Sequence, residues 1–445
     1  MELMHMKDRI KNLIDELDTR LLERKELIRL AILSIFSKQH MMLYGVAGVG
    51  KTLAINQIMK IIQNETAWEI LLNDETTLES LIPQPHRPPQ EVLTDSRCLL
   101  SRRFVFLDEM FKGTQQLLNA LLPILNERRY QLGGDTFELK LNSVFAASNE
   151  IPQDKFIEPF KDRILFWLDV KSLQDKSNRI KFYTEQFASS TDALQDSFSV
   201  EDIERVDEIV SYTKTIKMTE SIAVVYQEII ERLRRGFLGI SDRKTGRNFI
   251  IKALKVSALL NDRTSINHSD LLLVRHCAWT NLSQRYSAFK AVDEIIFGSK
   301  ADIQRNIVQN AHLLYNMMTH YQLELDSFLD LLDSLKRDEY ENKYQLLQEY
   351  VEKLNAFRAN LDTIEKARDE SQRILQECLD NVFVGEDVYK SNIPYREERI
   401  RDDIDRLVVK FEIEFGKMKQ YLEQYKDFHT YQELFRLQEE ERRMA

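Results

Sequence analysis

Apolar side chains recur every three or four positions over most of this chain, and this spacing predicts amphipathic helices. Residues 6–38 follow the pattern first and predict one or two helices. Shorter, continuously apolar runs interrupt it in the first 170 residues, and each predicts a buried strand. These runs lie at residues 41–44, 67–72, 104–107, 143–147 and 164–168. Residues 130–139 alternate around a Gly-Gly pair and predict a β-hairpin.

Beyond about residue 172 the pattern is helical to the end of the chain. Residues 301–384 contain neither glycine nor proline, and their apolar positions follow a 4-3 spacing. After a break at residues 382–394, the spacing resumes over residues 400–428. Such a repeat favours a left-handed coiled-coil seam, which we interpret as antiparallel helices in a hairpin or small bundle. A plain helical-bundle core would bury the same face, so the pattern leaves both open.

The first apolar run leads into GVAGVGKT, which has the G-x-x-x-x-G-K-T pattern of a Walker A phosphate loop. Glycine permits positive φ and a close backbone approach, so the loop amides can form an anion nest at a helix N-terminus. Lys51 is expected to reach the β- and γ-phosphates of ATP, and the Thr52 hydroxyl to ligate Mg²⁺. The predicted nucleotide-binding residues are Gly45, Val46, Ala47, Gly48, Val49, Gly50, Lys51 and Thr52.

The third apolar run ends in Asp108 and Glu109, the pattern of a Walker B strand. Carboxylates at the carboxyl end of such a strand lie outside the sheet, where open α/β folds bind their ligands. Asp108 would hold the hydration shell of Mg²⁺, and Glu109 would orient and deprotonate the attacking water. Asn149 ends the fourth run, so its amide could hydrogen-bond that water or the γ-phosphate. Ordinary strand-to-loop turns are the alternative interpretation of all three residues.

Arg163 stands immediately before the fifth apolar run. A guanidinium there could stabilise transition-state charge in cis, act in trans on a neighbouring subunit as an arginine finger, or merely pair with Asp162. The residues themselves leave these three roles open.

Composition narrows the class of protein. The chain has 445 residues and a net charge of −10, which argues against a general binder of nucleic acid or anionic membranes. Its three cysteines are far apart, which favours the reducing cytoplasm over a disulfide framework. No apolar run is long enough to span a membrane, and the charged N-terminus lacks the pattern of a signal peptide. Residues 73–102 hold half of the eight prolines and predict an irregular insert that touches a partner.

Taken in order, GVAGVGKT, FVFLDE, the Gly-Gly hairpin, AASNE and FKDRI resemble the motifs of an AAA+ ATPase. Within that superfamily the chain is similar to the MoxR group, and specifically to its RavA branch, through LLERKELIRL, FVFLDEMFK, LLPILNERRYQ and ISDRK. The resemblance covers residues 7–285. It implies an α/β AAA+ P-loop ATPase core, an αβα sandwich with parallel sheet order 5-1-4-3-2, followed by an α-helical lid. After about residue 290 the similarity to RavA fades, so the decarboxylase partner of RavA is not expected here.

The resemblance also implies roles for individual residues. They are Asp108 and Glu109 as Walker B residues, Asn149 as sensor 1, Arg163 as arginine finger and Arg243 as sensor 2. Because the sensor 2 loop is about two residues longer than the family pattern, Arg247 is an alternative to Arg243. We expect three parts: the core with its N-terminal helices at 1–195, the lid at 196–290, and a helical coiled-coil extension at 291–445.

The leading functional hypothesis is therefore an ATP hydrolase, using ATP and Mg²⁺, that remodels or helps mature a protein client. The family implies a homo-oligomeric, hexameric ring and a partner with a von Willebrand factor A domain. One alternative is a nucleic-acid translocase whose hairpin at 130–139 tracks DNA, although Asp135, Glu138 and the acidic net charge count against it. The other is a scaffold in which ATP sets the assembly state with little hydrolysis.

Overall fold

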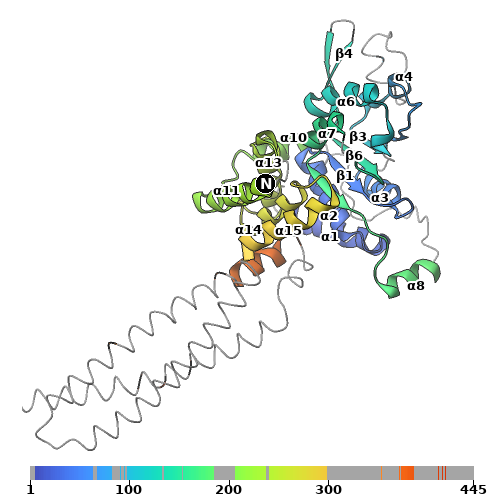
Figure 1. Cartoon of the computed structure of the whole chain (residues 1–445). Coiled ribbons are helices and arrows are strands. Elements are labelled where there is room, and N and C mark those ends of the chain that lie inside the picture. Colours follow the sequence, from blue (N-terminus) through green and yellow to red (C-terminus); the bar gives the residue numbers. More distant parts are fainter. Residues whose placement is uncertain are drawn as a thin grey trace, which may run out of the picture. The chain divides into compact units, whose positions relative to one another are not determined.

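The computed structural model describes residues 6–63, 68–82, 98–132, 135–152, 154–184, 206–236, 240–297 and 372–384, together with isolated positions at 91, 95, 352, 370, 409, 413 and 416 (Figure 1). The chain divides into two compact units. The first comprises residues 1–296 and 375–388, and the second comprises residues 297–374 and 389–445. Apart from isolated positions, the predicted coiled-coil seams at 301–369 and 400–428 lie outside the described residues.

A five-stranded parallel sheet forms the centre of the first unit. Its strands are β1 (Met41–Tyr44), β2 (Trp68–Leu71), β3 (Phe104–Asp108), β6 (Ser143–Ser148) and β7 (Phe166–Asp169). Their spatial order is β2-β3-β6-β1-β7. When these five strands are numbered 1 to 5 along the chain, β6 is the fourth and β7 the fifth. Read from β7, the observed order is then the expected 5-1-4-3-2. The labels differ because the hairpin strands β4 and β5 are numbered between β3 and β6.

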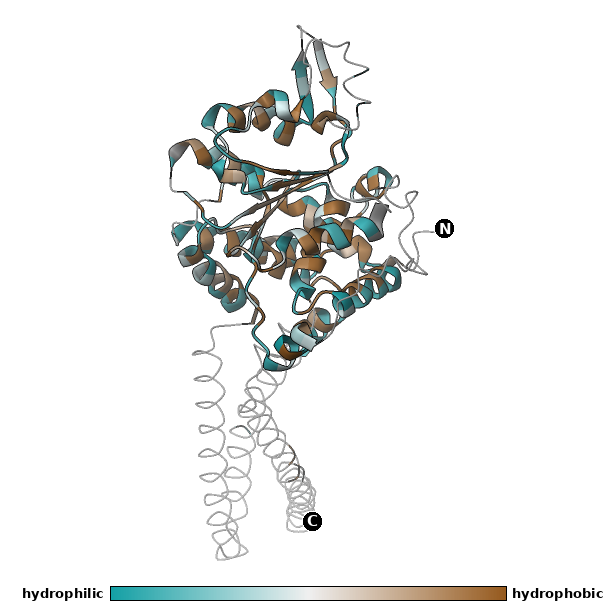
Figure 2. Ribbon diagram, turned by 90° about the vertical axis from the view of Figure 1, so that its right-hand side faces the viewer, coloured by the Kyte–Doolittle hydropathy of each residue, from teal (hydrophilic) through white to brown (hydrophobic). Residues whose placement is uncertain are grey.

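Helices pack on both faces of this sheet, and Figure 2 shows their apolar residues turned towards the strands. They are α2 (Lys25–Ser37), α3 (Lys51–Gln63), α6 (Gln115–Glu127) and the short α7 (Glu158–Arg163), while α1 (Met6–Arg20) packs on α2. Every residue of α2 from Leu27 to Ser37 is buried, because this helix lies against α1, α3 and the sheet and also against α10 and α13 of the lid. The expected αβα sandwich is confirmed.

The predicted Gly-Gly hairpin is confirmed as β4 (Arg129–Leu132) and β5 (Asp135–Glu138), paired antiparallel. Figure 1 shows it projecting from the end of α6, away from the central sheet. The proline-rich insert contains two short helices in its described part, α4 (Leu78–Leu81) and η1 (Leu99–Ser101). After β3 the chain forms η2 (Met110–Lys112), and before α7 it forms η3 (Lys155–Ile157).

The region expected to form the lid, from residue 196 onward, is mainly helical in its described part and also holds one isolated parallel bridge, between Lys217 and Ser265. It contains α10 (Val206–Tyr212), α11 (Glu220–Arg235), α12 (Asp242–Thr245), α13 (Ile250–Leu260), α14 (His268–Leu271), η4 (Leu272–His276) and α15 (Leu282–Phe297). The buried rings of Trp167 in β7 and Trp279 after η4 lie 6.1 Å apart and join the lid to the sheet. Between core and lid, α8 (Lys176–Thr184) buries none of its residues. No helix in the described part of the chain is both long and apolar enough to cross a membrane.

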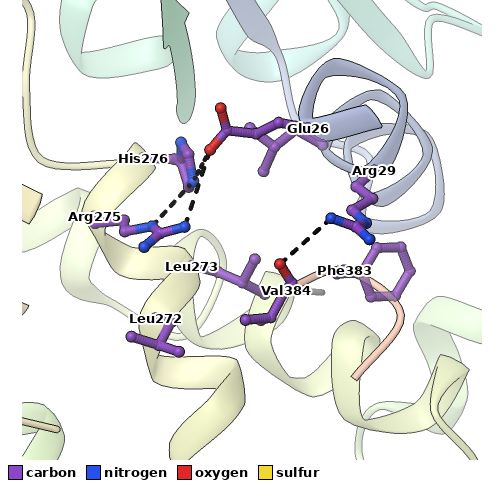
Figure 3. Close-up of a pocket in the computed structure, with 9 residues that line it drawn as sticks. Glu26, Arg29, Leu272, Leu273, Arg275, His276, Phe383 and Val384 are labelled. Atoms are coloured by element: carbon purple, nitrogen blue, oxygen red, sulfur yellow. Dashed lines mark hydrogen bonds and ion pairs between the residues drawn. The ribbon is translucent and has the colours of Figure 1, made fainter. Parts of the chain in front are cut away.

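The chain returns to the first unit at Leu375, and the structure describes this returning segment as far as residue 384. The Asn381 side chain is 2% exposed and hydrogen-bonds Asn261, Ser269 and Asp270 of the lid. Figure 3 shows Phe383 and Val384 beside α2 and η4, where they help to line a cavity of about 110 Å³. In this cavity Glu26 lies 3.4 Å from His276 Nε2 and 3.9 Å from Arg275, and Arg29 donates to the carbonyl of Val384 at 3.5 Å.

Candidate nucleotide site

The loop at residues 45–50 connects β1 to α3 at the carboxyl edge of the sheet. Gly48 and Gly50 both have a φ of 82°, in the left-handed region that residues with a side chain rarely adopt. A Cβ atom on Gly45 would lie 2.4 Å from the carbonyl oxygen of Val170, which is too close for any side chain. The loop therefore needs glycine for its backbone angles at two positions and for close packing at a third.

Lys51 lies over this loop and is only 7% exposed. Its Nζ donates hydrogen bonds to the carbonyl oxygens of Gly45, at 2.6 Å, and Val46, at 3.1 Å. Burial lowers the pKa of Lys51, while the carboxylates of Asp108 and Glu109 act in the opposite direction. The ammonium group is thus held between the phosphate loop and the two acids, where it can reach a phosphate in the loop.

Thr52 and Asp108 form the side of the site that fits a metal ion. The Thr52 hydroxyl donates to Asp108 Oδ2 across 3.4 Å, joining the first turn of α3 to the end of β3. Hydroxyl and carboxylate oxygens suit Mg²⁺, which usually takes one or two protein ligands and completes its shell with water and substrate phosphates. The described residues contain no cluster of three or more His, Cys, Asp or Glu side chains able to hold a metal by themselves. The pair therefore fits an ion that arrives with a nucleotide.

Glu109 has an unusual backbone, with a φ of 50°. Its N–H donates to Asp108 Oδ1 at 3.0 Å, which fixes the two acids relative to each other. Its Oε2 atom is buried and accepts no hydrogen bond, and the nearest cation is Lys112 Nζ at 3.6 Å. No hydrogen-bond donor occupies this carboxylate oxygen, so it can accept a proton from a water molecule that enters the site, as a general base must.

Asn149 directly follows β6, the strand between β3 and β1. Tyr44 and Ser148 are partners in the sheet register, and the Gly45 N–H donates to the Ser148 carbonyl at 3.1 Å. These contacts put Asn149 beside the first residue of the phosphate loop. The structure therefore brings five sequence-predicted residues to one edge of the sheet: Lys51, Thr52, Asp108, Glu109 and Asn149.

Arg163 and Arg243 lie together at the opposite edge of the sheet. Arg163 ends α7, and the N–H of Leu165 then bonds to the carbonyl of His40, at the amino end of β1. The Asp162 carboxylate lies 3.2 Å from Arg243 and 4.0 Å from Arg163. β1 has four residues, so its length of about 13 Å separates these arginines from the phosphate loop of their own chain.

This arginine pair shares a single carboxylate. Burial lowers the pKa of Arg163, the neighbouring Arg243 lowers it further, and Asp162 opposes both effects. Arg163 also donates to the Pro159 carbonyl at 2.8 Å, and its buried Nε has no hydrogen-bond partner. Two cations with one anion leave excess positive charge, which suits an approaching phosphate. Arg247, the alternative sensor 2 residue, is exposed.

Arg24 is a contact residue that the sequence analysis did not identify. Its guanidinium donates to the carbonyl oxygen of Val49, inside the phosphate loop, at 2.7 Å. An arginine at the start of a helix is ordinary, and it lies 25 residues before its partner. Only the folded turn between α1 and α2 brings the two together, so no sequence signal marks this residue.

Two family models match the chain. Residues 8–208 match the MoxR domain in the MoxR-vWA-beta-propeller ternary systems, and residues 217–292 match the AAA lid domain. Chaperone MoxR1 of Mycobacterium tuberculosis is 22% identical over 165 residues, covering 36% of this chain and 44% of that protein. Together the two family models span the nucleotide site and the arginine pair described above.

Two further similarities cover more of the chain. An uncharacterized protein of Methanocaldococcus jannaschii is 28% identical over 370 residues, which are 82% of this chain and 90% of that protein. The match to the AAA lid domain ends at residue 292. A similarity over 370 residues is longer than the chain up to that point, so it includes part of the extension that follows the lid. The crystal structure of a candidate ATPase from Cytophaga hutchinsonii has a TM-score of 0.52 at 18% identity, covering 66% of this chain and 95% of that one. It supports the fold.

Proposed function

We propose that this chain, a MoxR-family AAA+ ATPase as its two family matches and its fold support, hydrolyses ATP to remodel or help mature a protein client. The main support is the contact of the Thr52 hydroxyl with Asp108 beside the buried Lys51. A phosphate-binding cation and an oxygen pair for Mg²⁺ are the minimum that ATP binding requires.

The residues at this edge divide the chemistry among them. Lys51 and the loop amides would bind the phosphates, and Thr52 and Asp108 would hold Mg²⁺, which neutralises phosphate charge when bound. Glu109 would take the proton of the attacking water through its buried carboxylate oxygen. Asn149 would orient that water or the γ-phosphate from the adjacent strand.

The positions of Arg163 and Arg243 support an assembly of several copies. Both lie at the sheet edge opposite their own phosphate loop, about the length of β1 away from it, and this placement favours contact with a neighbouring copy. We propose that they act in trans on the nucleotide of a neighbouring subunit in a ring, which the family resemblance suggests is hexameric. Arg243 is our choice for sensor 2 over Arg247, because Asp162 holds it beside Arg163.

Partners are proposed from the matched family alone. The MoxR domain model describes systems that also contain a vWA protein and a β-propeller protein, so a von Willebrand factor A domain partner is expected for this chain. Similarity to the RavA branch is proposed from LLERKELIRL and FVFLDEMFK alone.

Two substitutions test ATP hydrolysis. Lys51→Ala should abolish ATP binding, while Lys60→Ala, at an exposed position of the same helix, should not. Glu109→Gln should bind ATP and release no phosphate, because the amide keeps the shape of the side chain without its basicity. Normal turnover by Glu109→Gln would refute the assignment of the base. A parent protein that binds ATP with negligible turnover would favour the scaffold, and stimulation by DNA would favour the translocase.

The role of the arginines in trans has a separate test. Arg163→Ala and Lys51→Ala variants are each expected to be inactive alone. Mixed rings contain some sites that combine an intact Lys51 from one subunit with an intact Arg163 from its neighbour, so mixing should restore part of the activity. Arg243→Ala should behave like Arg163→Ala in this assay. Mixtures that stay inactive, although native mass spectrometry shows mixed assemblies, would exclude action in trans.

A further inference from the structure

The turn between α1 and α2 contacts two functionally different segments through adjacent residues. Arg24 donates from one guanidinium nitrogen to the carbonyl of Val49, at 2.7 Å, and from another to the carbonyl of Glu23, at 2.9 Å. Glu23 has a φ of 56°, in the left-handed region that costs a residue with a side chain about 1 kcal/mol. Such conformations persist where surrounding contacts impose them, and here those contacts lie on both sides of the turn.

The bond from Arg24 determines how one peptide group of the phosphate loop is oriented. In a planar trans peptide the C=O and the following N–H point in opposite directions, and the described residues contain no cis peptide bond. When the Val49 carbonyl points to Arg24, the Gly50 N–H must therefore point to the other side of the loop. Glycine accepts positive and negative φ almost equally, so this peptide could otherwise turn over at little cost. Arg24 keeps the amide available to a phosphate.

Glu23 binds the segment that leads into α8. Its carboxylate accepts hydrogen bonds from the N–H groups of Gln174, at 2.6 Å, and Asp175, at 2.9 Å, and from the Asn178 amide, at 3.0 Å. Burial opposes ionisation of Glu23, but these bonds outweigh it, so its pKa is lowered. Asp175 in turn accepts from the N–H groups of Ser177 and Asn178 and caps α8. Because α8 buries none of its residues, this contact is important for its placement.

We propose that the Glu23–Arg24 turn is a relay: Arg24 positions the Val49–Gly50 peptide for nucleotide binding, and Glu23 transmits a shift of that peptide to the start of α8. The relay rests on the proposed function, since it requires that a nucleotide binds in the loop. Arg24 is a positioning residue, because it acts through the loop backbone. Movement at residues 174–178 then follows directly from the hydrogen bonds that tie them to the same turn.

Affinity measurements test the first half of the relay. The probe is Mg²⁺-ATP, binding to the full-length Glu109→Gln protein. Adding Arg24→Met should weaken binding about tenfold, while Arg24→Lys, which keeps the charge and one donor, should weaken it less. Lys25→Met is the matched control: it removes the same charge from the next residue, whose partners Asp15 and Asp18 are remote from the loop, and should change affinity less than twofold. Equal affinity of Arg24→Met and Lys25→Met would overturn the positioning role.

Hydrogen–deuterium exchange tests the second half. In the Glu109→Gln protein, Mg²⁺-ATP should change exchange of peptides covering residues 172–184 at least twofold. Adding Glu23→Gln leaves one acceptor oxygen in place of two, so this response should disappear while the affinity for ATP stays within threefold. A response that survives Glu23→Gln, or no response in a protein that binds ATP, would overturn the relay alone. Failure of the Glu109→Gln protein to bind ATP would instead remove the proposed function and the relay with it.

Discussion

Asn381 gives the sharpest test of how the chain beyond the lid is joined to it. The chain leaves the first unit after Ile296 and returns to it at Leu375, and the returning segment inserts the Asn381 amide among lid side chains. Asn381→Leu preserves the approximate size of the side chain and removes all four of its side-chain hydrogen bonds. We expect this single change to weaken the lid, although position 381 is remote from the nucleotide site in sequence.

The magnitude follows from the bonds that are lost. Asn381 Oδ1 accepts from Asn261, at 3.1 Å, and from the N–H of Phe383, at 3.0 Å. Its Nδ2 donates to Ser269, at 2.9 Å, and to the Asp270 carboxylate, at 3.0 Å. A neutral bond contributes about 1 kcal/mol, and a bond to a charged group somewhat more. Asn261 and Asp270 keep other partners, so we expect a net loss of about 2–4 kcal/mol of unfolding free energy.

Thermal and urea unfolding of the full-length protein would measure this loss. Trp167 and Trp279 are both fully buried at the contact of sheet and lid, so their fluorescence reports its separation. The expected change in Tm is about 5–10 °C, at a few degrees per kcal/mol for a unit of this size. Gln376→Ala, an exposed position on the same returning segment, is the control and should change Tm by less than 2 °C. An Asn381→Leu protein as stable as this control would refute the reasoning.

Three further predictions concern the core. Gly45→Ala would push a Cβ into the Val170 carbonyl, 2.4 Å away, so ATP affinity by calorimetry should fall at least tenfold. Lys112→Met removes the cation that lies 3.6 Å from Glu109 Oε2, the oxygen proposed as the base. The kcat should fall severalfold while the affinity for ATP stays unchanged. A lower affinity would contradict the view that Lys112 acts only on Glu109. Burial, together with the nearby Arg128 and Arg243, lowers the pKa of His40 to about 3. Between that pH and about 6.5 the unfolded state therefore binds more protons than the folded state, and the free energy of unfolding falls as the pH falls. From pH 6.5 to 5.5 the parent should lose about 1 kcal/mol more than His40→Gln in urea titrations; equal losses would show that His40 does not contribute.

The sheet and most of the site could be predicted from sequence because their signals are local. Buried parallel strands are continuously apolar, and the runs at 41–44 and 104–107 coincide with β1 and β3. The GVAGVGKT loop combines a strand, three glycines and a helix start within a dozen residues. Asn149 was predicted because the carboxyl ends of parallel strands meet at one edge of the sheet.

The remaining contacts join residues far apart in the chain, and no local pattern indicates them. Asp162 and Arg243 are 81 residues apart, so the sequence could name each arginine without showing that Arg163 and Arg243 share one carboxylate. The helical pattern runs up to the break that begins at residue 382, and it gives no sign that Asn381 enters a polar cluster of the lid. Asparagine side chains are mostly exposed, so burial of this one depends entirely on tertiary packing.

Helix α2 explains how these separate contacts can act on one another. It begins next to Arg24, which holds the phosphate loop, and its Arg29 donates to the carbonyl of Val384 in the returning segment, at 3.5 Å. Just beyond its last residue, Lys38 pairs with Asp207 of the lid. The helix has 13 residues and is about 20 Å long. A buried helix of this length moves as a rigid body, because its packing allows little bending. One element thus contacts the phosphate loop's anchor, the lid and the returning segment, so a displacement of the loop would have a path to both through α2, and the proposed relay through Glu23 to α8 would be a second path from the same turn.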